Sequence, residues 1–77
     1  MCLSDAPCNI SLKILKINSE MVTRKKLLSM GIRPDDSLIK IFEMNWGGVI
    51  VQNLTTNSTK VALSKSLAND IIVDYAA

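Results

Sequence analysis

The sequence predicts a small, mainly β protein in which five short strands curl into a closed barrel, with one short helix inserted after the first strand and a one-turn helix before the last. Two observations lead to this prediction. Short β-prone runs recur between turn residues, and 77 residues have room for a single domain, residues 1–77. Hydrophobic residues make up 48% of the chain but aromatic residues only 4%, so we expect an aliphatic core.

The first predicted strand covers residues 9–17, where apolar and polar side chains alternate. Three apolar residues would share one face of this strand: Ile10, Leu12 and Ile14. The alternation slips at Leu15, after which Ile17 continues the opposite face. We therefore expect a bulge or a strong bend at Leu15, which suits a small barrel.

A helix of about three turns is predicted next. Ser19 is its expected N-cap, with Glu20 in the first turn, and Gly31 is its expected C-cap. The apolar side of this helix would comprise Met21, Leu27, Leu28 and Met30. The side toward solvent would carry three cations: Arg24, Lys25 and Lys26.

The segment after the helix predicts a turn, in which Pro34 fixes its own φ and the two following aspartates can hydrogen-bond nearby backbone groups. Asp35 and Asp36 are the only carboxylates close together in the sequence. Adjacent acids in a proline turn are usually solvated, so we favour turn formation over a cation site.

Residues 37–54 predict a hairpin, because two strongly β-prone runs flank a Gly-Gly pair. Gly47 and Gly48 would supply positive φ angles at the turn. Trp46, the only tryptophan of the chain, is thereby carried to the hairpin tip. Its ring would either contact a partner or fold over the mouth of the barrel.

The last third of the chain predicts four short elements. A second turn covers residues 55–59, and a short strand follows at 60–63. A single helical turn at 64–70 would have Ser64 as its cap, and residues 71–75 would form the last strand.

Catalytic and metal-binding residues are scarce. The chain has no histidine, which removes the usual general base and the commonest transition-metal ligand. Its three glycines cannot form a P-loop, and the spacing of Cys2 and Cys8 matches neither a redox motif nor a zinc knuckle. We therefore expect a non-enzymatic protein that takes no cofactor and no small-molecule substrate.

The longest apolar runs are far shorter than the roughly 20 residues that span a bilayer. The N-terminus has no basic stretch followed by an apolar one, so it does not resemble a secretory signal. We expect a cytoplasmic protein that reaches a membrane only through a partner.

The net charge is only +2, and the excess is local, because Arg24, Lys25, Lys26 and Arg33 cluster. Small barrels often bind single-stranded nucleic acid by stacking bases on aromatic residues within a basic groove. A single tryptophan and a small basic patch make nucleic acid the less favoured partner.

Several segments, taken in order, resemble the FeoA family of bacterial ferrous iron uptake. They are Leu3-Ser4-Asp5, the run from Lys26 to Pro34, Gly47-Gly48, Val61-Ala62-Leu63 and Ala68 to Val73. The departures include Asp35 in place of the glycine of Pro-Gly, Val49 in place of a proline, Ser64 in place of an arginine and Cys8 in place of a glycine. Asp enters the left-handed region more readily than most residues, so the turn at Asp35 should persist.

The resemblance implies an SH3-like barrel and a protein that acts on the cytosolic, GTP-hydrolysing part of the ferrous iron transporter. We expect the contact to involve two sets of residues, the hairpin tip (Met44, Asn45 and Trp46) and the basic helix face (Arg24, Lys25 and Lys26). Turn and cap roles fall to Gly31, Pro34, Asp35, Gly47 and Gly48. Two alternatives remain open: a nucleic-acid-binding barrel, and a transition-metal-responsive domain, since the barrel also resembles a domain of iron-dependent repressors.

Overall fold

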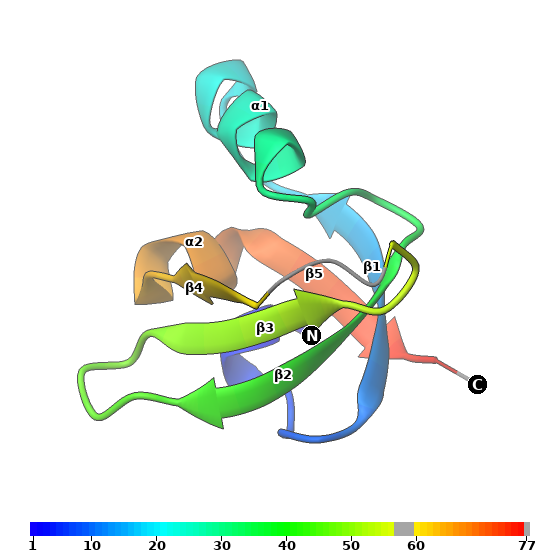
Figure 1. Ribbon diagram of the computed structural model, residues 1–77. Coiled ribbons are helices and arrows are strands. Elements are labelled where there is room, and N and C mark those ends of the chain that lie inside the picture. Colours follow the sequence, from blue (N-terminus) through cyan, green and yellow to red (C-terminus); the bar gives the residue numbers. More distant parts are fainter. Residues whose placement is uncertain (57–59, 77) are drawn as a thin grey trace.

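The computed structural model describes residues 1–56 and 60–76, and the chain forms one antiparallel sheet of five strands in the order β4-β3-β2-β1-β5 (Figure 1). The predicted mainly β fold is confirmed. The elements are η1 (Leu3–Asp5), β1 (Ser11–Ile17), α1 (Met21–Ser29), β2 (Ser37–Glu43), β3 (Val49–Asn53), β4 (Val61–Leu63), α2 (Lys65–Asp70) and β5 (Ile71–Tyr75).

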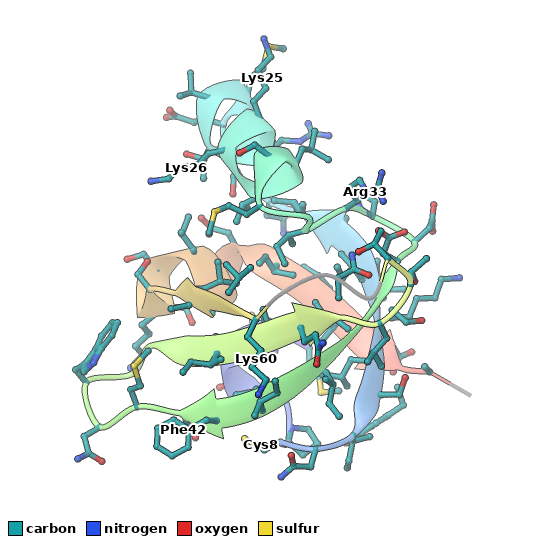
Figure 2. All side chains as sticks on the ribbon, in the orientation of Figure 1. Cys8, Lys25, Lys26, Arg33, Phe42 and Lys60 are labelled. Carbon is teal, nitrogen blue, oxygen red and sulfur yellow. The ribbon has the colours of Figure 1, made fainter. Side chains whose placement is uncertain are left out.

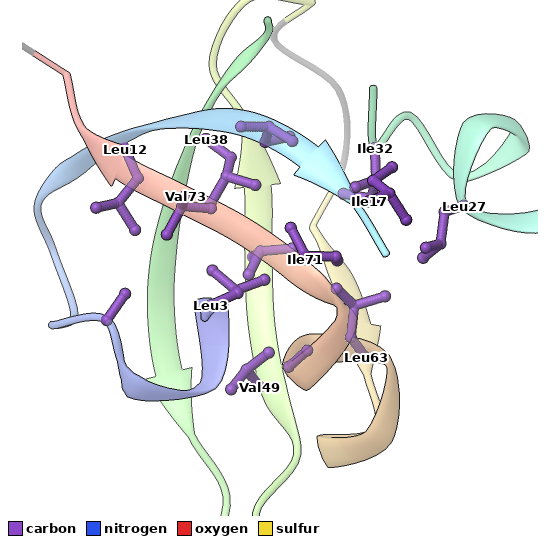
Figure 3. Packing of buried hydrophobic residues seen from close by; sticks show 14 residues of the cluster. Leu3, Leu12, Ile17, Leu27, Ile32, Leu38, Val49, Leu63, Ile71 and Val73 are labelled. Carbon is purple, nitrogen blue, oxygen red and sulfur yellow. The ribbon is translucent and has the colours of Figure 1, made fainter. Parts of the chain in front are cut away.

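The sheet curls around an aliphatic core. Its two edge strands, β4 and β5, are joined by the short helix α2, and the N-terminal turn η1 packs against both α2 and β5. Figure 3 shows the buried side chains gathered between these elements. The core consists of Leu3, Ala6, Leu12, Ile14, Ile17, Leu27, Ile32, Leu38, Val49, Val51, Leu63, Ala68, Ile71 and Val73.

The bulge predicted in the first strand is confirmed, because the pairing of β1 with β5 shifts register between Ile14 and Lys16. The prediction that Ile17 lies on the opposite face of the strand from Ile14 is wrong. The extra residue, Leu15, is exposed, and the strand resumes with Ile17 buried on the same side as Ile14. The bulge therefore lets Ile17 face the core, as Ile14 does, although the two residues are an odd number of positions apart.

The helix α1 ends as predicted and begins differently. Gly31 has φ +88°, its N–H donates to the carbonyl of Leu28, and the N–H of Ile32 donates to that of Leu27. This pair of bonds is a Schellman motif, and both Leu27 and Ile32 are buried as that motif favours. At the other end Glu20 occupies the N-cap position without a side-chain bond. Ser19 does not cap the helix, because its hydroxyl bonds Asp70.

The predicted apolar side of α1 is right for two of its four residues. Leu27 is buried, and Met30, which follows the helix, packs partly buried against the core. Met21 and Leu28 are exposed, and that part of the prediction is wrong. Figure 1 shows the reason, since α1 stands clear of the sheet instead of lying on it. Leu27 and Ile32 meet Ile17 at the base of the helix (Figure 3), so a single small junction joins α1 to the barrel.

The second half of the chain follows the prediction. The hairpin is formed by β2 and β3, and the Ser64 hydroxyl accepts a bond from the Leu67 N–H at 3.3 Å as the N-cap of α2. Residues 54–56 form a turn, while 57–59 of the predicted second turn lie outside the described residues. None of the helices in the described part of the chain is long and apolar enough to cross a bilayer.

Candidate partner-binding surface

The tip of the β2-β3 hairpin is a tight turn closed by two backbone bonds. The Gly47 N–H donates to the Met44 carbonyl at 2.9 Å, and the Met44 N–H donates to the Gly48 carbonyl at 2.8 Å. Gly47 has φ +97°, so it supplies the left-handed residue that follows the turn. Gly48 has no positive φ, and its predicted role is therefore wrong. This type of turn needs one left-handed residue and not two.

Gly48 is required for a different reason, which is the closeness of Trp46. A Cβ atom built on Gly48 would overlap the six-membered ring of the Trp46 indole. The outer edge of the ring therefore lies close against the backbone of Gly48 and covers it, which explains why this glycine is buried at the end of the hairpin. Trp46 itself remains 64% exposed. It is thus held in place on one side and open to solvent on the other, and it does not close the mouth of the barrel.

The neighbouring glycine faces the short helix α2. A Cβ on Gly47 would lie 2.8 Å from Cδ of Lys65, the first residue of α2. The hairpin tip therefore rests on the aliphatic stem of Lys65. Met44 is half-buried beside the turn, and Asn45 is exposed.

An apolar row continues from the tip across the outer face of the sheet. Phe42 on β2 is paired with Ile50 on β3, and Ile50 is paired with Ala62 on β4. Directly paired residues share a face, and this face is the outer one because Val49 and Val51 point into the core. Gly48 lies two residues from Ile50, so the Trp46 ring covers the same face. We call this surface, made of Phe42, Trp46, Ile50 and Ala62, the hairpin face.

A bulge in β2 decides that Phe42 is on the hairpin face. Leu38 and Lys40 are buried, so simple alternation would bury Phe42 as well. The pairing of β2 with β3 shifts register between Lys40 and Phe42, and the Phe42 ring is exposed at the outer side (Figure 2). The sequence prediction therefore missed Phe42 and Ile50. No local pattern gave this exposure, because a period of two places Phe42 on the face of the buried Lys40.

The same bulge creates an ionic contact below the hairpin. The buried ammonium of Lys40 donates to the Ser4 carbonyl at 3.0 Å, to the Ala6 carbonyl at 2.8 Å and to the Glu43 carboxylate at 2.5 Å. Because of the extra residue, Glu43 shares the side of Lys40 despite their odd spacing. Lys40 thus holds the N-terminal segment under the strand that carries Phe42, a role the sequence prediction missed.

A second buried polar residue positions α1. The Asn53 amide nitrogen donates to the Gly31 carbonyl at 2.5 Å and to the Asp36 carboxylate at 3.0 Å, while the Asn53 oxygen accepts from the Thr56 N–H at 3.0 Å. Asp36 also pairs with Arg33 at 3.2 Å. The end of α1 is therefore joined to the end of β3.

The turn after α1 has the predicted form. Asp35 has φ +70° and donates its N–H to the Ile14 carbonyl at 2.7 Å, so it takes the left-handed position expected of a glycine. Its neighbour Pro34 is exposed. Asp36 is occupied by Arg33 and Asn53.

The predicted partner-binding residues lie on two separate surfaces. Arg24, Lys25 and Lys26 are exposed on α1, and Figure 1 shows this helix at the opposite end of the molecule from the hairpin tip. Arg33, predicted in the same basic cluster, is paired with Asp36. The structure therefore does not bring the basic helix face and the tip residues Met44, Asn45 and Trp46 together. Among the described residues, no three His, Cys, Asp or Glu side chains form a group that could hold a metal ion.

Comparison with known proteins agrees with this architecture. Three solved structures share the fold at 20 to 23% sequence identity, a level that shows the fold alone. The iron(II) transport protein A of Clostridium thermocellum has 20% identity over 97% of this chain, with a TM-score of 0.85. This chain spans 45% of the length of that protein.

Two crystal structures match over nearly their whole length. An iron uptake regulatory protein, FeoA, has 23% identity over 95% of this chain and 93% of its own, with a TM-score of 0.82. The FeoA of Stenotrophomonas maltophilia, complexed with zinc and described as a prokaryotic SH3 domain protein, has 23% identity over 96% of this chain and 89% of its own, with a TM-score of 0.75.

No curated protein sequence matches the chain. The model of the FeoA domain, in contrast, matches residues 1–75, which is nearly the full length. The order of the sequence segments, the SH3-like sheet and this match agree, and the chain belongs to the FeoA domain family.

Proposed function

We propose that this protein is a non-enzymatic regulator of bacterial ferrous iron uptake that acts by binding the cytosolic, GTP-hydrolysing part of a ferrous iron transporter. The family is related to ferrous iron transport, and the S. maltophilia relative is described as a candidate activating factor of that transport. The proposal places the protein in the cytoplasm, where that part of the transporter lies.

One observation carries this proposal, which is the organisation of the hairpin face. Trp46 is held against Gly48 while most of its surface stays exposed. Tryptophan is the residue most often found to dominate the energy of a protein interface, and a ring that is already ordered loses little entropy on binding. Phe42 and Ile50 extend the same apolar surface across two strands.

The surface is small, so the complex should be weak and transient. Aromatic residues make up 4% of the chain, and two of the three, Phe42 and Trp46, lie exposed on this one face. Neither ring belongs to the core, which is aliphatic, so most of both rings stays available to a partner.

The test is titration of the purified protein into the transporter's cytosolic domain, with and without guanine nucleotide, followed by calorimetry or NMR. Trp46→Ala should weaken binding by about 2 kcal/mol or more, as expected for an interface hot spot. Tyr75→Ala is the matched control, because Tyr75 is an exposed aromatic residue on β5, the opposite edge of the sheet from β4.

Two results would contradict the proposal. One is the absence of binding at high micromolar concentration in either nucleotide state. The other is binding of a labelled single-stranded oligonucleotide that weakens steeply with salt and is lost in Trp46→Ala, which would identify a nucleic-acid-binding barrel instead.

A further inference from the structure

The two edge strands of the sheet differ in how far they are covered. On β5, the Met1 ammonium donates to the Val73 carbonyl at 3.0 Å, and the Val73 N–H donates to the Met1 carbonyl at 2.8 Å. Cys2 is bridged with Ile72 in the same antiparallel sense. On β4, in contrast, the three residues form backbone bonds only within their pairing with β3, among the described residues. The side of β4 away from β3 is therefore an open edge.

The register of the hairpin shows which residues of β3 turn their backbone groups toward β4. In an antiparallel ladder, successive residues direct their N–H and C=O groups to one neighbouring strand and to the other in alternation. The Met44 N–H donates to the Gly48 carbonyl, so two residues further on it is Ile50 that directs its groups to β2. Val49 and Val51 therefore direct theirs to β4.

The same alternation leaves one residue of β4 facing the open edge. Leu63 and Val61 are the residues paired with Val49 and Val51, so their N–H and C=O groups face β3. The N–H and C=O of Ala62, which lies between them, point away from the sheet. The Ala62 side chain is exposed on the hairpin face. This residue thus presents one unused donor, one unused acceptor and only a methyl group beside them.

Unpaired backbone groups on a sheet edge fit one kind of ligand best, which is another extended chain. Such a chain bonds the edge through its own N–H and C=O groups, and its alternate side chains lie on the outer face of the sheet. On this protein they would lie beside Ala62, which is small enough to leave Ile50 on the next strand within reach. The open edge therefore adjoins the hairpin face directly.

The cations beside β4 disfavour a second copy of the chain as this ligand. Lys60 and Lys65 are exposed, one before β4 and one after it, and neither forms an ion pair among the described residues. Two copies related by a twofold axis would pair Ala62 with Ala62, which brings Lys60 of each copy close to Lys65 of the other. Like charges so placed repel each other, whereas carboxylates would be attracted. The edge therefore fits an acidic segment.

We propose that an extended, acidic segment of the transporter's cytosolic part pairs with β4 as a sixth strand of the sheet. The inference rests on the proposed function and names the form of partner that the hairpin face takes. The Ala62 N–H and C=O bond one residue of this segment, and its apolar side chains continue the row formed by Phe42, Ile50 and Ala62. Its carboxylates lie near Lys60 and Lys65.

Amide hydrogen exchange followed by NMR tests the open edge, first in the free protein and then with the transporter's cytosolic domain. In the free protein, the Ala62 amide should exchange at least about tenfold faster than those of Val61 and Leu63, which bond β3. Binding should slow the Ala62 amide at least about tenfold and leave that of Val73, on the covered edge, unchanged. If the domain binds and Ala62 stays unprotected, strand addition is overturned while the proposed function stands. If nothing binds, both are overturned.

Substitution of Ala62 separates its backbone contact from its side-chain contact. Ala62→Pro removes an N–H that the monomer does not use, so the fold should be kept while binding weakens about tenfold. Ala62→Val is the matched control, because it adds similar bulk and keeps the donor, and it should change the affinity less than about threefold. Equal losses would overturn the proposal. Circular dichroism checks folding, and if the proline variant unfolds, the Ala62 exchange rate in the parent complex decides.

The charge of the segment is tested by Lys60→Glu, which should weaken binding at least about threefold at low salt and less at high salt. Lys13→Glu is the control, since Lys13 is exposed on β1 and its replacement changes the net charge equally. An equal effect of the two variants would overturn the acidic character of the segment. A dimer of the parent protein in which the Ala62 amide is protected without the transporter domain would identify a second copy as the occupant and overturn the proposal.

Discussion

The indole ring of Trp46 lies against the backbone of Gly48, two residues further along the hairpin, and a single methyl group on that glycine would overlap the ring. The adjacent Gly47 is constrained by its backbone angle, φ +97°. Two neighbouring glycines thus serve two different physical purposes. One permits a close approach, and the other permits a left-handed conformation.

Alanine substitutions should separate these two purposes. Gly47→Ala should reduce the free energy of unfolding by about 1 to 2 kcal/mol, because an alanine there takes a left-handed angle. Gly48→Ala should cost less, because the exposed ring can rotate away, but it should lower the fluorescence anisotropy of Trp46. Urea denaturation and fluorescence measure the two effects. A larger loss of stability in Gly48→Ala than in Gly47→Ala would contradict this assignment.

Lys40→Met should destabilise the protein by about 1 to 3 kcal/mol, because the Ser4 and Ala6 carbonyls lose their donor while the buried volume is kept. Glu43→Gln should cost less than about 1 kcal/mol, since the Glu43 side chain is 55% exposed and its ion pair is screened by water. Urea unfolding compares the two variants. If Lys40→Met is as stable as the parent protein, the hydrogen bonds of the Lys40 ammonium make no net contribution to the free energy of unfolding, as occurs for some buried ion pairs.

Asn53→Ala should lower stability by about 1 to 3 kcal/mol and release the end of α1, because the Gly31 carbonyl and the Asp36 carboxylate both lose a donor. Amide hydrogen exchange should accelerate at residues 27–32, which are joined to β3 through this side chain. Asn45→Ala is the control, since Asn45 is exposed at the hairpin tip. Unchanged exchange in α1 would show that Asn53 does not position this helix.

Asp35→Gly should leave the stability nearly unchanged. The glycine removes the cost of a side chain at φ +70°, but it also increases the freedom of the unfolded chain by a similar amount, about 0.5 to 1 kcal/mol. Asp35→Ala should cost about 1 kcal/mol, because alanine is less tolerant of this angle than aspartate. The two melting curves provide the comparison. Equal stability of the glycine and alanine variants would show that the left-handed backbone angle at residue 35 does not limit which side chain is tolerated there.

Features that depend on neighbouring residues could be predicted from the sequence. The slip in alternation at Leu15 indicates the bulge, Gly31 marks the end of α1, and Ser64 marks the start of α2. Each of these rests on a backbone angle, a local hydrogen bond or a two-residue period. The hairpin of β2 and β3 follows from the same local signals, whereas the pairing of β1 with β5 joins segments that are distant in the sequence.

Features that depend on distant residues were decided only by the tertiary structure. Ser19 has the residue type of a cap but bonds Asp70, which is 51 positions away. Lys40 is buried because backbone carbonyls of the N-terminal segment reach it, and Phe42 is exposed because the partner strand accommodates a bulge. The sequence by itself determined the five strands and the two α-helices, since their signals are short-range, but not the N-terminal turn η1. Which polar groups are buried and which aromatic rings face solvent was decided by packing between segments that the local pattern does not relate.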